Sequence, residues 1–136
     1  MILFLDANII IYRVEVVEPF NQKVFAAVQE LVALYPDAGF AVSRLSMLEC
    51  LVKPLRDKNS AEIDRYRGFF ASAGLLVVEV SSLVIETATL LRARHGLRTP
   101  DAIQAASALS VKVPVTFLTG DKQFLKVPEL NVRLVF

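Results

Sequence analysis

Four acidic residues, spread over nearly the whole chain, each stand in a short motif at a place where an apolar segment ends: Asp6, Glu49, Asp101 and Asp121. Because they are far apart in sequence, only the fold can bring them together. Carboxylates that are brought together repel one another, and a hard divalent cation relieves the repulsion by taking their oxygens as ligands. The acids therefore predict a metal-dependent enzyme if they share one edge of the fold.

Each acid, taken alone, also has a structural explanation. Asp6 follows an apolar run and is a good N-cap for a helix that begins beside it. Glu49 completes a capping box with Ser46. Asp101 falls in the first turn of a helix, where the helix dipole favours negative charge, and Asp121 after a glycine is typical of a turn. A joint function depends on common placement rather than on any single motif.

The elements that must position these acids alternate along the chain. Short apolar runs without polar alternation are typical of strands buried on both faces, and they predict strands at residues 2–5, 40–42, 75–80, 115–118 and 132–136. Apolar residues spaced by three or four predict helices at about 20–35, 45–55, 60–73, 82–94 and 99–109, the last with Thr99 as N-cap. The alternation predicts an α/β fold of three layers with a parallel sheet, in one domain over residues 1–136.

Parallel sheets bind ligands beyond the carboxyl ends of their strands, where the strand order reverses. Asp6, Glu49 and Asp121 fall at that edge because they follow the first, second and fourth predicted strands. Asp101 begins the helix that leads into the fourth strand. It reaches the same edge only if the connection bends back.

Composition narrows the class of protein. The chain has 136 residues, of which 54% are hydrophobic, yet no apolar run is long enough to cross a bilayer and the first residues lack the features of a signal peptide. A formal net charge of +1 neither requires nor excludes nucleic acid. Cys50 is the single cysteine, so an internal disulfide is excluded and a reducing cytoplasm is expected. Cys50 is expected in the core, and His95, the single histidine, is expected at the C-terminal end of a helix. With one cysteine and one histidine, no zinc site is predicted.

Four segments, in a fixed order over essentially the full length, resemble the PIN-domain ribonucleases and, among them, the VapC toxins of toxin–antitoxin pairs. They contain the motifs Leu5-Asp6-Ala7-Asn8, Ser46-Met47-Leu48-Glu49, Thr99-Pro100-Asp101-Ala102 and Thr119-Gly120-Asp121-Lys122. The resemblance implies a five-stranded parallel sheet with helices on both faces. It also implies that the four acids converge on one pocket that binds Mg²⁺ or Mn²⁺, which supplies the bent connection that Asp101 requires.

Residues around the acids take roles from the same resemblance. Asn8 and Thr119 match positions that assist the acids by hydrogen bonding, and Ser46 is expected to do the same beside Glu49. Arg98 and Lys122, the basic residues next to two of the acids, are expected to contact substrate phosphates.

Two positions depart from the family pattern. Ala7 stands where a hydroxyl residue is common, and Gln123 stands where a further acid is common. The resemblance therefore implies a first metal, held mainly by Asp6 and Asp101, and gives less support to a second. Whether one or two ions bind stays open.

The function implied is metal-dependent hydrolysis of RNA, of tRNA or another structured RNA, by a cytoplasmic toxin that a cognate antitoxin neutralises. The apolar excess favours a homodimer, and no membrane is involved. The alternative is a PIN-like module that only binds RNA or protein. A receiver-like phosphoacceptor domain would need an aspartate directly after the third strand, where the chain instead has Ser81 and Ser82 after Val80.

Overall fold

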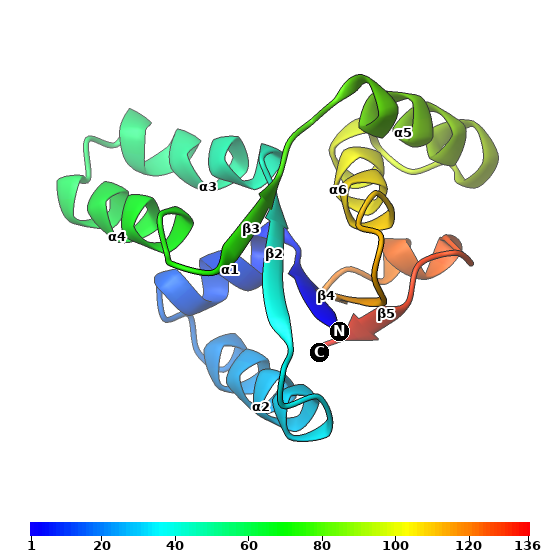
Figure 1. Cartoon of the computed structure of the whole chain (residues 1–136). Coiled ribbons are helices and arrows are strands. Elements are labelled where there is room, and N and C mark those ends of the chain that lie inside the picture. Colours follow the sequence, from blue (N-terminus) through cyan, green and yellow to red (C-terminus); the bar gives the residue numbers. More distant parts are fainter.

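Strands and helices alternate along the chain in the computed structural model, which describes residues 1–136 (Figure 1). The strands are β1 (Ile2–Leu5), β2 (Gly39–Ser43), β3 (Leu75–Val78), β4 (Val115–Thr119) and β5 (Val132–Leu134). The helices are α1 (Ala7–Val14), α2 (Phe20–Leu34), α3 (Leu45–Arg56), α4 (Ser60–Phe70), α5 (Ser82–His95) and α6 (Thr99–Leu109), and a short 3-10 helix, η1, spans Lys122–Lys126.

All five strands pair in parallel, in the order β3-β2-β1-β4-β5. In the central strand β1, Leu3 lies opposite Phe40 of β2, and Leu5 lies opposite Leu118 of β4. The chain builds outwards from β1 to β2 and β3, and then adds β4 and β5 on the other side of β1. The strand order thus reverses at β1, which is where such sheets bind ligands. The predicted parallel α/β sheet is confirmed.

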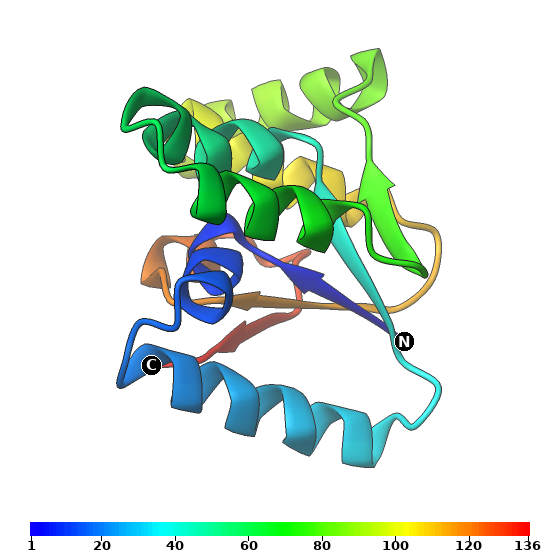
Figure 2. The ribbon, with the colours of Figure 1, turned by 90° about the vertical axis from the view of Figure 1, so that its left-hand side faces the viewer.

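Helices cover both faces of this sheet. Helices α1 to α4 lie on one side, and α5 and α6 lie on the other (Figure 1 and Figure 2). Successive residues of β1 enter the two cores, because side chains of a strand alternate between its faces. Leu3 and Leu5 pack in the core of the α1 to α4 side, and Phe4 packs in the core of the α5 and α6 side beside Phe117.

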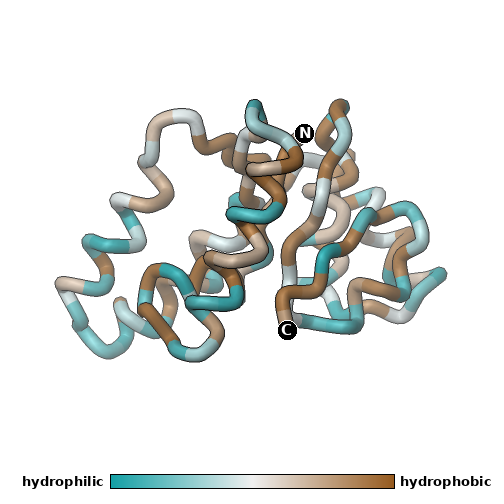
Figure 3. The backbone as a smooth tube through the Cα atoms, turned by 90° about the horizontal axis from the view of Figure 1, so that it is seen from below, coloured by the Kyte–Doolittle hydropathy of each residue, from teal (hydrophilic) through white to brown (hydrophobic).

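Hydrophobic and hydrophilic residues both occur along the helices (Figure 3), and each helix buries residues at helical spacing. In α5, for example, Val84, Ala88 and Leu91 are buried at spacings of four and three. Some apolar residues remain on the surface, among them Leu48 and Val52 of α3. None of the helices has the length and hydropathy of a membrane-spanning segment.

Helix α1 is not predicted by apolar periodicity. Ile9, Ile10 and Ile11 follow one another, and β-branched residues have modest helix propensity. The helix forms here because Asp6 caps its N-terminus and because Ile9 and Ile10 are fully buried against the sheet. Burial of the apolar face outweighs the weak local propensity.

Element ends differ from the prediction by one to three residues; helix α4, predicted to reach residue 73, ends at Phe70. Strand β3 ends at Val78 rather than at residue 80. Helix α6 has Arg98 at its N-cap and includes Thr99, so the predicted Thr99 cap is wrong by one position. Gly96 has a left-handed backbone with φ of 69° and ends α5, as predicted.

Candidate active site

Asp6 is the centre of the site. Asp6 directly follows β1, the strand at which the strand order reverses. The residue is buried, with a relative exposure of 6%. Burial, and the negative charges of Glu49 and Asp101, raise its pKa from 3.8 to about 7, although hydrogen bonds from Thr119 and Ala7 act in the opposite direction. Three acids from three parts of the chain are therefore close enough to act on one another.

Helix packing explains how Glu49 and Asp101 reach Asp6. Helix α3 packs against α1 and against α6, so its second turn lies between the helix that Asp6 caps and the helix that Asp101 begins. Asp101 is buried in the first turn of α6, as predicted. The connection between β3 and β4 does bend back to the carboxyl edge of the sheet.

Two polar side chains join Asp6 to the loop after β4. Thr119 donates its hydroxyl hydrogen to Oδ2 of Asp6 at 2.7 Å, and Asn8 donates from Nδ2 to the same oxygen at 3.2 Å. Thr119 Oγ1 accepts the backbone N–H of Asp121 at 3.0 Å, and Asn8 Oδ1 accepts that of Gly120 at 3.3 Å. Asn8 and Thr119 thus orient the carboxylate of Asp6 and the chain that carries Asp121.

Asp121 lies at the edge of the site. It is the N-cap of η1, and its Oδ1 accepts the backbone N–H of Gln123 at 2.9 Å. Its charge is not among those that raise the pKa of Asp6. Asp121 therefore caps a helix, as predicted. It is connected to Asp6 through Thr119, which hydrogen-bonds to both residues.

The predicted capping box of Ser46 and Glu49 is wrong. Arg44 is the N-cap of α3 and makes no side-chain capping bond. Ser46 and Glu49 instead accept hydrogen bonds from Gln104 of α6, both at 2.8 Å. The box fails because the two side chains point to the neighbouring helix rather than to the first turn of their own.

Gln104 is a polar residue of the site that the sequence reasoning missed. It is 1% exposed, and it lies one turn after Asp101 on α6. The available signal was its spacing of three from Asp101, which puts both on one side of the helix.

Two basic residues flank the acids. Nε of Arg98 is 3.3 Å from Oδ2 of Asp101, and 79% of the Arg98 side chain is exposed. Lys122, next to Asp121, is exposed as well. Both predicted phosphate contacts are accessible to a large substrate.

His95 and Cys50 do not join the acids as ligands. His95 ends α5, as predicted, with Nε2 at 3.8 Å from Oε2 of Glu129. Cys50 is buried, as predicted, and burial together with nearby carboxylates raises the pKa of its thiol. A thiol that keeps its proton is a poor metal ligand.

The acids fit a hard cation by their chemistry. No three His, Cys, Asp or Glu side chains stand close enough together in this structure to hold a metal ion, so the carboxylates share a neighbourhood without forming a closed cage. Their oxygens are nevertheless the ligands that Mg²⁺ and Mn²⁺ prefer. Burial is the main cause of the raised pKa of Asp6, and the charges of Glu49 and Asp101 add to it; a cation would relieve that part of the repulsion.

Comparisons with known proteins give the same picture of the fold. Similar solved structures include VapBC2 from Rickettsia felis bound to a DNA fragment from its promoter, with 19% identity, a TM-score of 0.76 and 98% of each chain covered. A toxin–antitoxin complex from Klebsiella pneumoniae has 21% identity, a TM-score of 0.73 and 98% of each chain covered. VapBC-1 from nontypeable Haemophilus influenzae has 19% identity and a TM-score of 0.74, over 99% of this chain and 98% of that one.

Sequence comparison identifies the family. Among curated proteins, none matches this chain. A family model described as the PIN domain matches residues 3–130, which is nearly the whole length, and the chain therefore belongs to the PIN domain family.

Proposed function

We propose that the protein is a metal-dependent endoribonuclease, a VapC-like toxin that hydrolyses phosphodiester bonds in RNA. The observation that carries the proposal is the gathering of Glu49 and Asp101 around the buried Asp6, whose pKa burial and charge raise to about 7. A buried carboxylate with a strongly raised pKa at a strand-order reversal, as Asp6 is, is typical of a catalytic site. Membership of the PIN domain family supports nuclease activity.

Asp6 and Asp101 would be the main ligands of Mg²⁺ or Mn²⁺, with Glu49 beside them. A divalent cation held there supplies Lewis acidity toward the phosphate and lowers the pKa of water. Thr119 and Asn8 keep Oδ2 of Asp6 oriented and favour its ionised form.

A second ion has less support than the first. One carboxylate oxygen of Asp121 already accepts a hydrogen bond at the N-terminus of η1, and the Gln123 side chain is uncharged. We infer that Asp121 acts through water or on the substrate side of the site.

The substrate would be a structured RNA, such as tRNA. Arg98 is an exposed cation beside Asp101, and Lys122 is an exposed cation that follows Asp121; both could hold phosphates near the cleaved bond. Their charge also offsets the repulsion between an RNA backbone and the carboxylates.

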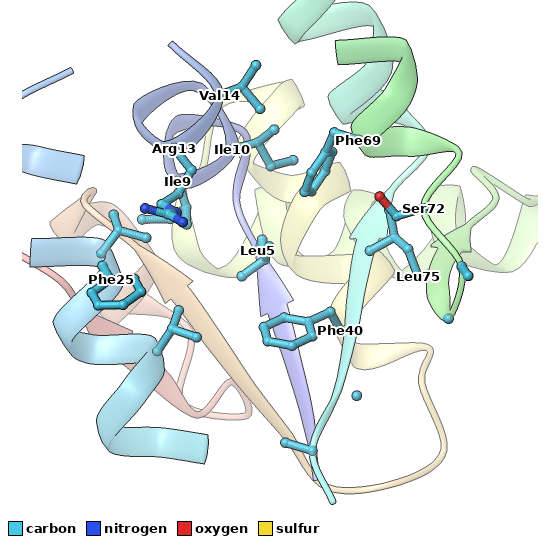
Figure 4. Close-up of a pocket in the computed structure, with 16 residues that line it drawn as sticks. Leu5, Ile9, Ile10, Arg13, Val14, Phe25, Phe40, Phe69, Ser72 and Leu75 are labelled. Atoms are coloured by element: carbon cyan, nitrogen blue, oxygen red, sulfur yellow. The ribbon is translucent and has the colours of Figure 1, made fainter. Parts of the chain in front are cut away.

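The partner would be an antitoxin, and the similar solved structures include a toxin–antitoxin complex. An apolar cavity of about 690 Å³ on the α1 to α4 side fits an apolar segment of such a partner. Phe25, Phe40 and Phe69 stand around it (Figure 4). Leu5, the residue before Asp6, lines its floor. A segment bound there would bring neighbouring basic side chains of the antitoxin close to the acids.

A homodimer would cover one of the apolar faces that the fold leaves on the surface. Leu48, Val52 and Leu55 are exposed at spacings of four and three along α3, so they lie on one side of the helix. This face of α3 is the proposed contact between two copies.

The decisive experiment is RNA cleavage by the purified protein, followed by sequencing of RNA ends, with Mg²⁺, with Mn²⁺ and with EDTA. Asp6→Asn should lose cleavage while remaining folded. Asp37→Asn, an exposed acid before β2 at the opposite edge of the sheet, is the matched control and should cleave normally. Full cleavage by Asp6→Asn would exclude this mechanism, and specific RNA binding without any cleavage would favour the non-catalytic module.

A further inference from the structure

Helix α6 meets the end of β2 and the first turns of α3 along a line of buried polar side chains. Ser107 Oγ donates to Ser43 Oγ at 2.9 Å, and Gln104 Nε2 donates to Ser46 Oγ and to Glu49 Oε1, both at 2.8 Å. The three serines are fully buried, and Gln104 is 1% exposed. We call this line, formed by Ser43, Ser46, Gln104 and Ser107, the polar seam.

One end of the polar seam lies at the acids. Ser43 ends β2, Ser46 and Glu49 are three apart on α3, and Asp101 and Gln104 are three apart on α6. The carboxylates of Glu49 and Asp101 therefore extend the seam from its two sides. The two hydrogen bonds of the Gln104 amide are the only side-chain hydrogen bonds between α6 and α3.

The orientation of the Gln104 amide follows from its partner. A carboxylate only accepts hydrogen bonds, so the NH₂ group must face Glu49. This leaves Gln104 Oε1 buried without any hydrogen-bond partner. A buried unpaired acceptor lowers stability, and an apolar side chain of similar size would avoid that loss. The stability of the interface alone does not account for a glutamine here.

We propose that Gln104 is a positioning residue for the metal site. Its NH₂ group fixes Oε1 of Glu49 relative to α6, and Oε2 of Glu49 stays free of protein hydrogen bonds. The amide thereby fixes the distance between the carboxylate that α3 supplies and the one that α6 supplies. This inference rests on the proposed function, because it assigns Glu49 to the metal.

The test compares two seam variants by Mn²⁺ titration of the full chain, with calorimetry for affinity and urea unfolding for stability. Gln104→Met keeps the volume and removes the donor, and Mn²⁺ affinity should fall about 10- to 100-fold, as is usual when a residue that orients a ligand is lost. Ser107→Ala removes the seam bond that does not touch Glu49. It should lower stability and leave Mn²⁺ affinity unchanged.

A double-mutant cycle with Glu49→Gln shows whether Gln104 acts through Glu49. If it does, Gln104→Met should cost little further affinity in the Glu49→Gln background. Normal Mn²⁺ affinity in Gln104→Met, with weakened affinity in Glu49→Gln, would overturn the positioning role and leave the proposed function standing. Normal affinity in both would remove Glu49 from the metal site and the positioning role with it.

A measurement on the unmutated protein guards against a variant that does not fold. In ¹⁵N-labelled protein, addition of Mg²⁺ should shift the side-chain NH₂ resonances of Gln104, because its partner Glu49 changes environment. The exposed Gln29 on α2 is the internal control and should not shift. An unshifted Gln104 at saturating Mg²⁺ would overturn the inference.

Discussion

Thr119, the last residue of β4, donates its hydroxyl hydrogen to Oδ2 of Asp6, which follows β1, over 2.7 Å. The same hydroxyl oxygen accepts the backbone N–H of Asp121. A hydrogen bond to a carboxylate favours its ionised form, so Thr119 opposes the burial that raises the pKa of Asp6. One side chain thus links the end of β1 to the end of β4 and favours the ionised form of Asp6.

The first prediction concerns this hydrogen bond. Thr119→Val removes the hydroxyl at nearly constant volume, and the pKa of Asp6 should rise above its present value of about 7. Ionised Asp6, and with it Mn²⁺ binding, then requires a higher pH. The pH midpoint of Mn²⁺ binding should move upwards by about 1–2 pH units, which corresponds to the strength of a hydrogen bond to a charged group.

Two controls accompany Thr119→Val. Thr119→Ser keeps the hydroxyl and should restore the midpoint. Thr116→Val changes the same strand at its other end, where the hydroxyl contacts Met1 and Asn131, and should leave the midpoint unchanged. An unchanged midpoint in Thr119→Val would mean that Asp6 does not govern metal binding.

The second prediction is that Asp6 destabilises the metal-free protein at neutral pH. Its carboxyl ionises near 3.8 in the unfolded chain and near 7 in the fold. Between these values the folded protein keeps a proton that the unfolded chain has released. The contribution of this carboxyl to the free energy of unfolding is therefore complete below about pH 4 and is lost as the pH rises to 7. The loss is on the order of 2–4 kcal/mol.

Asp6→Asn removes this pH dependence, so in EDTA the variant should gain stability over the unmutated protein as the pH rises from 4 to 8. Urea unfolding at several pH values measures the difference. Asp37→Asn, whose carboxyl is exposed, should follow the unmutated protein. Adding Mn²⁺ at pH 8 should stabilise the unmutated protein and leave Asp6→Asn unaffected. Parallel pH curves for all three proteins would contradict the prediction.

The sequence was sufficient for the sheet and for the edge at which three acids lie, because buried parallel strands are continuous apolar runs and because Asp6 follows one of them directly. It was not sufficient for Asp101. Helix periodicity says which side of α6 Asp101 occupies, but the bend of the chain before α6 depends on packing against α5 and β2. Only the family resemblance predicted that bend.

Local motifs failed where long-range hydrogen bonds compete. Ser46 and Glu49 have the spacing of a capping box, yet both accept from Gln104, which is 58 and 55 residues away in sequence. A motif of four residues describes only what the backbone of one turn needs. It contains no information about a donor on another helix, so neither the lost box nor the role of Gln104 could be read from the pattern.

The third prediction concerns the apolar face of α3. Val52 lies between Leu48 and Leu55 on the exposed face of α3. Val52→Lys would place a charge in the contact between two copies, where burying it without a partner is unfavourable. The unmutated protein should have the mass of a dimer by light scattering at micromolar concentration, and Val52→Lys that of a monomer. Leu125→Lys, an exposed leucine on η1, should remain dimeric. A monomeric mass for the unmutated protein would contradict the dimer.

The fourth prediction separates antitoxin binding from catalysis. Phe25 of α2 lines the apolar cavity and is half-exposed, with Arg13 at 5.4 Å from its ring centroid. Because the ring is partly in solvent, Phe25→Glu should leave the fold intact. It should weaken binding of the antitoxin encoded by the neighbouring reading frame by at least about tenfold, since a carboxylate would be buried against an apolar segment.

RNA cleavage by Phe25→Glu should be normal in the absence of antitoxin. The side chains that orient Asp6 are those of Asn8 and Thr119, and Phe25 is not one of them. With antitoxin present, the variant should continue to cleave at concentrations that silence the unmutated protein. Leu34→Glu introduces the same charge on the same helix outside the cavity, and it should be silenced normally. Equal inhibition of Phe25→Glu and Leu34→Glu would place the antitoxin on another surface, whereas loss of cleavage by Phe25→Glu alone would tie the cavity to the active site.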